Sequence, residues 1–183
     1  MRSDALLALV LLAAACDEKS EGPAPERFAS VKKKADTKAS TFCEKTFAAG
    51  EKKWAAPKTD GPFSEAKGWR WVNLWATWCK PCVEEMGLLN MWNEQLDVTI
   101  DLLSIDEPDA DLESWKKKNL PGQITRIASQ DDFTKLLEGL GLDKNAAIPI
   151  HLLVDPKGDV RCIRVGSIKQ ENYGAVRELV SSP

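Results

Sequence analysis

The stretch Trp71-Val-Asn-Leu-Trp-Ala-Thr-Trp-Cys-Lys-Pro-Cys82 decides the fold, because it leads from an apolar strand into a helix through two cysteines. The apolar run predicts a strand over 69–77, and helical spacing predicts a helix over 80–95. The apolar residues on one face of that helix are Met86, Leu89 and Trp92. Cys79 then lies at a helix N-terminus, where free backbone N–H groups and the helix dipole stabilise a thiolate, and Pro81 suits the first helical turn. We therefore expect Cys79 and Cys82 to form a dithiol that cycles with a disulfide.

The rest of the chain alternates strand and helix signals. Further strands are predicted over 98–105 and 123–128, and helices over 109–118, 129–137 and 170–180. A hairpin is predicted over 150–154 and 160–165, because Asp155-Pro-Lys-Gly158 fits a tight turn. Two strands flanking one helix pair in parallel, so the order predicts an α/β fold with one sheet and helices on both faces.

The N-terminus has the composition of an export signal. An apolar stretch follows Arg2 and ends in small residues before Cys16, and Leu12-Ala-Ala-Ala-Cys16 resembles the lipobox of bacterial lipoproteins. We expect a lipoprotein-type signal peptide over 1–15, a lipidated Cys16 and tether over 16–40, and one domain over 41–183. A plain signal peptide cleaved near Ala15 is the alternative. Both predict export to the bacterial periplasm or cell envelope, with a lipid anchor to the membrane in the first case.

The chain has five cysteines, and an oxidising compartment permits disulfides. With Cys16 lipidated and Cys79 paired with Cys82, we predict a structural disulfide between Cys43 and Cys162. The alternative is two unpaired buried thiols.

Composition excludes several other functions. The net charge of −3 offers no electrostatic basis for binding nucleic acid, and no cofactor is expected. A Cys-x-x-Cys can be half of a zinc site, but no second such motif exists, and completing the site would require Cys43, Cys162 or His151. We expect His151, the single histidine, to pack or form hydrogen bonds within its strand.

The segment Val72–Met86, with its Trp-Cys-Lys-Pro-Cys core, resembles the active-site segment of membrane-anchored thioredoxin-like proteins of the TlpA and ResA type. Ile148-Pro149 followed by the predicted hairpin resembles the cis-proline hairpin of the same family. The resemblance covers about 57–180 and implies a thioredoxin-like fold, with a central mixed sheet flanked by helices on both faces. It also implies thiol-disulfide oxidoreductase activity.

The resemblance further implies roles for individual residues. Cys79 would be the exposed nucleophile, and Cys82, shielded within the first turn, would resolve the mixed disulfide. Pro149 would be a cis-proline packed against the two sulfurs. The backbone at Ile148 would pair with a substrate peptide, and Trp78 would line the substrate surface.

A proton carrier is also implied. Thioredoxin has a buried acid six residues before its first active cysteine, where this chain has Asn73, whereas the TlpA and ResA branch has a glutamate that corresponds to Glu85. Glu85 would exchange a proton with Cys82. The alternative is a solvated helix residue, as expected for Glu84.

The expected function is the reduction of protein disulfides at the envelope. The family implies clients such as apocytochrome c or a copper-site protein, and turnover requires a membrane thiol electron donor. Two other functions stay open: a copper-binding metallochaperone module that uses Cys79 and Cys82, and a redox-silent adaptor that uses only the fold.

Overall fold

The computed structural model describes residues 39–181, and these contain one six-stranded mixed sheet with the strand order β1-β6-β5-β2-β3-β4. The strands are β1 (Lys45–Thr46), β2 (Trp69–Trp75), β3 (Val98–Ser104), β4 (Gln123–Arg126), β5 (Ile150–Val154) and β6 (Val160–Val165). The helices are α1 (Ala39–Phe42), α2 (Lys80–Gln95), α3 (Leu112–Lys116), α4 (Gln130–Gly139) and α5 (Tyr173–Val180), with a short 3-10 turn η1 (Gln170–Asn172) before α5.

The centre of the sheet is built from the two units that the sequence predicts. In the first unit, α2 connects β2 to β3 along the chain, and the two strands pair in parallel, from Trp69 opposite Val98 to Trp75 opposite Ser104. β5 and β6 form the antiparallel hairpin, whose turn has Gly158 at a φ of 80°, a conformation that glycine adopts without steric cost. β5 inserts next to β2 and runs antiparallel to it, which makes the sheet mixed.

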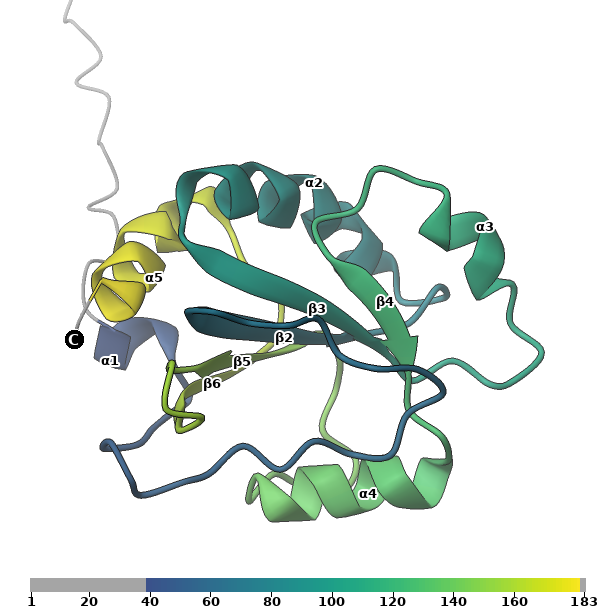
Figure 1. Cartoon of the computed structure of the whole chain (residues 1–183), viewed down its shortest axis with the longest axis horizontal. Helices are drawn as coiled ribbons and strands as arrows, with labels where there is room; N and C mark the ends of the chain where they lie inside the picture. The colour runs from purple at the N-terminus through teal and green to yellow at the C-terminus, as the bar shows by residue number, and fades with distance from the viewer. Residues whose placement is uncertain (1–38, 182–183) are drawn as a thin grey trace, which may run out of the picture. The chain divides into compact units, whose positions relative to one another are not determined.

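Helices cover both faces of the sheet (Figure 1). On one face, α2, α3 and α5 pack on a cluster that includes Trp71, Trp75 and Leu153. On the other face, α4 packs on Val72 and Leu152. Alternate residues of each central strand therefore enter different cores, as expected for a strand buried on both sides.

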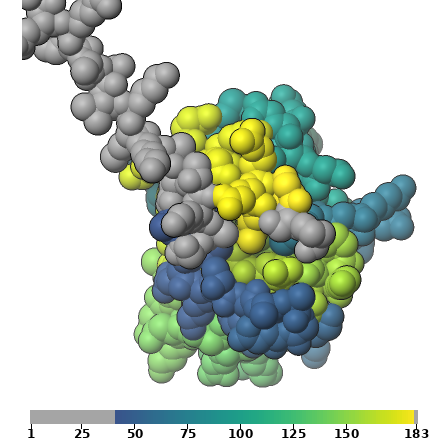
Figure 2. Space-filling view, turned by 90° about the vertical axis from the view of Figure 1, so that its left-hand side faces the viewer, coloured from purple at the N-terminus to yellow at the C-terminus, as the bar shows by residue number. Residues whose placement is uncertain are grey.

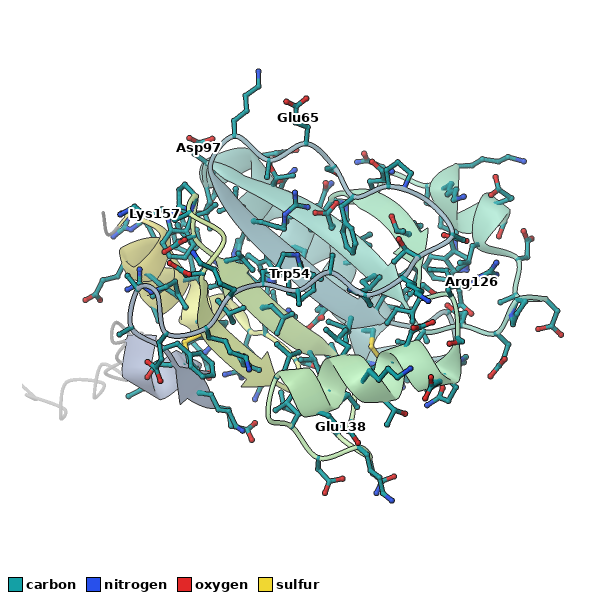
Figure 3. The ribbon with its side chains drawn as sticks, turned by 60° about the horizontal axis from the view of Figure 1, so that its bottom comes forward. Trp54, Glu65, Asp97, Arg126, Glu138 and Lys157 are labelled. Atoms are coloured by element: carbon teal, nitrogen blue, oxygen red, sulfur yellow. A yellow bond between two sulfur atoms is a disulfide. The ribbon has the colours of Figure 1, made fainter. Side chains whose placement is uncertain are left out.

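Two parts of the chain complete these faces. The segment that joins β1 to β2 carries Trp54 and runs beside α4, which carries Glu138 (Figure 3); Trp54 and Phe63 of this segment pack on the α4-side core. At the side of the sheet near β6, the start of the described chain lies next to α5 (Figure 2).

Most predicted elements are present with ends shifted by a few residues. The structure adds α1 and the two-residue strand β1, which are too short to show a periodic pattern. The predicted helix over 109–118 is shorter, because Asp111 caps its start by accepting a hydrogen bond from the Ser114 N–H. None of the helices within residues 39–181 is both long and apolar enough to cross a membrane. The predicted signal peptide and Cys16 lie outside the described residues.

Candidate active site

Cys79 and Cys82 lie at the start of α2 and are joined by a disulfide. Cys79 is the N-cap residue, and its Sγ accepts a hydrogen bond from the Cys82 N–H at 3.3 Å. Pro81 occupies the first turn, where a missing N–H leaves no intrahelical bond unmade. The free N–H groups of this helix end favour negative charge on the Cys79 sulfur when the pair is reduced.

The two cysteines differ less in exposure than the resemblance implies. Cys82 is fully buried, and Cys79 is only 5% exposed. In this disulfide form the Cys79 Sγ lies 3.8 Å from the Ile148 carbonyl oxygen, so the loop before β5 covers part of it. Cys79, which the resemblance implies to be exposed, is therefore almost fully covered and lines the floor of a hollow.

This hollow is largely apolar and has a volume of about 380 Å³. Its lining comes from the start of α2 and from the loops that precede α3 and β5: Trp78, Cys79, Lys80, Pro81, Ile105, Ala146, Ala147 and Ile148. Trp78 is 67% exposed and is the one large hydrophobic side chain that is exposed among the described residues. The Ile148–Pro149 peptide bond is cis, and the Pro149 carbonyl accepts a hydrogen bond from the Gly166 N–H at 2.8 Å. The apolar lining of the hollow and the adjacent backbone at Ile148 and Pro149 together form a surface that suits an extended peptide.

A carboxylate holds the loop that leads into the dithiol. Asp106 is buried just after β3 and accepts hydrogen bonds from the Thr77 N–H at 3.0 Å and the Thr77 hydroxyl at 2.8 Å. The Ser104 hydroxyl donates to the same carboxylate at 2.7 Å. The sequence analysis did not identify Asp106. The available signal was its place directly after a strand that is parallel to the strand leading into Cys79.

A buried polar cluster lies on the same side of the sheet as α2. Glu85 is 4% exposed, whereas its neighbour Glu84 is exposed, so the alternative of a solvated residue does not hold for Glu85. The Glu85 carboxylate accepts hydrogen bonds from the Asn73 side-chain amide at 3.1 Å and from the Ile168 N–H at 2.9 Å. His151 lies opposite Asn73 in the β2–β5 pairing, and its Nε2 is 3.4 Å from the Glu85 Oε1. Glu85 is therefore a buried acid one turn beyond the buried Cys82.

The second disulfide joins Cys43 to Cys162 and lies beside strand β1. Cys162 is on β6, directly opposite Thr46, and both cysteines are buried. All four described cysteines are thus paired in two disulfides. Within residues 39–181, no group of three or more histidine, cysteine, aspartate or glutamate side chains is placed to hold a metal ion.

Comparison with known proteins supports the resemblance seen in the active-site segment. No family model matches the chain. The thiol-disulfide oxidoreductase ResA of Geobacillus thermodenitrificans is 30% identical over 108 residues, which cover 55% of this chain and 56% of ResA. The thioredoxin-like protein YneN of Bacillus subtilis is 27% identical over 105 residues, which cover 55% of this chain and 58% of YneN.

The match to these curated relatives spans little more than half of their length. Among solved structures, a thioredoxin-related protein from Neisseria meningitidis serogroup B aligns with a TM-score of 0.51 and 25% identity, over 66% of this chain and 89% of that one. The chain thus has a thioredoxin-like fold and is similar in sequence to thiol-disulfide oxidoreductases of the ResA type.

Proposed function

We propose that this protein is a thiol-disulfide oxidoreductase that reduces disulfides of client proteins. The observation that carries the proposal is the placement of Cys79 and Cys82 at the start of α2, at the floor of an apolar hollow bordered by Trp78 and Ile148. The similarity to proteins named thiol-disulfide oxidoreductases supports the same chemistry.

In the proposed reaction the reduced Cys79 thiolate attacks one sulfur of a client disulfide and releases the other client sulfur as a thiolate. Cys82 then loses its proton to the Glu85 carboxylate, and its thiolate attacks the Cys79 sulfur. The Cys79–Cys82 disulfide forms and the second client sulfur leaves. The client disulfide gains two electrons and the protein dithiol loses them.

The hollow provides the proposed client site. The exposed face of Trp78 contacts an apolar side chain of the client, and the backbone at Ile148 pairs with the client as an added strand. Main-chain pairing demands little of the client sequence, which suits a reductant with several clients. Pro149 holds this backbone next to the two sulfurs.

The proposal also covers the location of the protein, its electron donor and its clients. We place the protein in the bacterial periplasm or cell envelope, anchored by a lipid on Cys16 and re-reduced by a membrane thiol donor. The proposed clients are apocytochrome c or a protein of copper-centre assembly. Replacement of Cys16 by serine tests the anchor, because it should move the protein from the membrane fraction to the soluble fraction of the envelope.

Trapping tests the chemistry directly. Cys82→Ser should accumulate a mixed disulfide between Cys79 and a client, whereas Cys79→Ser should accumulate none. Wild-type protein should reduce insulin, and the reduction potential of the pair should lie near the roughly −270 mV of thioredoxin. A potential near about −120 mV would contradict the reductant direction. Stoichiometric copper binding without any disulfide reduction would support the metallochaperone instead.

A further inference from the structure

His151 has an environment that determines which of its ring nitrogens carries the proton. Its Nδ1 lies 3.2 Å from the Trp71 Nε1 and 3.1 Å from the Asn73 Nδ2. The indole N–H is only a donor, so Nδ1 must accept. A neutral ring then carries its proton on Nε2, the atom that faces Glu85 at 3.4 Å.

The Asn73 amide links the two ionisable residues. One amide hydrogen points to the His151 Nδ1, and the other donates to the Glu85 Oε1. A hydrogen on Nδ1 would point at both the indole N–H and the amide N–H, so Nδ1 is the acceptor in this environment. Among the described residues, the buried His151 Nε2 forms no hydrogen bond with normal geometry, and the acceptor that it faces is the Glu85 Oε1 at 3.4 Å.

We infer that His151 is a neutral positioning residue that directs the Glu85 carboxylate toward the proton of Cys82. Three N–H groups surround this carboxylate, from Asn73, Ile168 and His151. The Asn73 and His151 groups face the Oε1, and the Ile168 N–H donates to the Oε2. Together they fix the carboxylate of a residue that lies on the same helix face as Cys82, three residues earlier. In the disulfide form the His151 contact is longer than a normal N–H···O bond, and it can shorten when Cys82 carries a proton to transfer.

The charged and titratable groups around this pair are few. On α2 they are Glu85 and, in the reduced protein, Cys82. On β6, Arg164 lies opposite His151, and its guanidinium donates to the Phe42 and Ser167 carbonyl oxygens. Glu85 is a buried carboxylate on the same face of α2 as the buried Cys82.

The inference rests on the proposed function and concerns one step of it, the attack by Cys82. The transfer moves one proton from the Cys82 sulfur to a Glu85 oxygen, while His151 keeps its own proton. Replacement of His151 should therefore affect the second thiol reaction and leave the first, at Cys79, unchanged.

Rapid mixing of the reduced protein with an aromatic disulfide, 5,5′-dithiobis(2-nitrobenzoate), separates the two reactions. Attack by Cys79 releases one coloured thiolate, and attack by Cys82 on the resulting mixed disulfide releases a second. We expect His151→Leu to slow the second release about tenfold at pH 6–7, the factor expected for losing one hydrogen bond to a charged group. The deficit should shrink as the pH rises, because hydroxide can then remove the Cys82 proton without Glu85.

Conservative variants separate positioning from packing. His151→Gln keeps an N–H near the Nε2 position and should restore the second release to within about threefold. His151→Asn places its amide near the Nδ1 position and should stay slow, which keeps the test valid if His151→Leu does not fold. Leu152→Ala is the matched control, because Leu152 is buried on the opposite, α4-side face and should leave both releases unchanged.

A double-variant cycle completes the test. In a Glu85→Gln background, His151→Leu should have no further effect on the second release, because the base that it positions is absent. An equal slowing of both releases, no slowing at all, or a His151→Leu effect that persists without Glu85 would overturn the inference. If wild-type protein released no second thiolate, the proposed function itself would fail, whereas normal wild-type kinetics with indifferent His151 variants would refute only the role of His151.

Discussion

The disulfide between Cys43 and Cys162 should be the main covalent source of stability. It closes a loop across 119 positions of sequence and attaches β1, which pairs with β6 through only two residues. The loop-entropy relation gives about 5 kcal/mol for a closure of this length. Since small domains are stable by roughly 5–15 kcal/mol, removing this disulfide should cost a large share of the total.

The perturbation is Cys43→Ala together with Cys162→Ala, because alanine adds no polar group to these buried sites. Urea unfolding without reductant, followed by far-UV circular dichroism, gives the free energy of unfolding of each variant. We expect a loss of about 5 kcal/mol and a fall in melting temperature of about 10–20 °C.

The matched control is the double variant Cys79→Ala and Cys82→Ala, which removes a disulfide that spans only three positions. The same relation gives about 2 kcal/mol for this short loop. The reasoning is refuted if the loss of the Cys43–Cys162 pair costs no more than the loss of the Cys79–Cys82 pair.

Three further predictions concern other positions. Gly122→Ala should sharply destabilise the protein, because an added Cβ would lie 2.0 Å from a backbone oxygen of β3; a melting temperature within about 2 °C of wild type would contradict this. Asp106→Asn should loosen the Thr77 loop and lower the rate of the first thiol release, with little change in the second; the aromatic disulfide assay measures both. The hydrogen bond from Lys53 lowers the pKa of Asp159, so its stabilising effect is present above the ordinary aspartate range and is lost as the pH falls through the lowered pKa. Asp159→Asn should therefore reduce the dependence of stability on pH below about 4, and an unchanged acid profile would exclude this contribution.

The central part of the fold follows from local sequence. The apolar residues of β2 and the helical spacing of Met86, Leu89 and Trp92 predict their elements without knowledge of their neighbours, because the period of burial matches the geometry of each element. The hairpin turn was predictable from its own residues, because Asp155-Pro-Lys-Gly158 provides the proline and the positive-φ glycine of a tight turn. The two-residue strand β1 was not, since pairing along so short an edge leaves no period to read.

The polar part of the site depends on pairing between distant segments. Sequence spacing predicts that Cys79 and Cys82 lie within one helix turn, and the family resemblance points to Glu85 as the acid. Spacing alone, however, left open that Glu85 is solvated like Glu84. The antiparallel insertion of β5 next to β2 is what sets His151 opposite Asn73 and surrounds Glu85 with N–H donors.

The sequence by itself therefore determined the dithiol, its helix and the strands around it, because these depend on residues that are close along the chain. Only the tertiary structure decided which acid is buried, which residues hold it, and which loop covers Cys79. Those outcomes depend on strand register and on the burial of polar groups. Their physical cause is that a buried carboxylate must find its hydrogen-bond donors on whichever segments the fold brings to it.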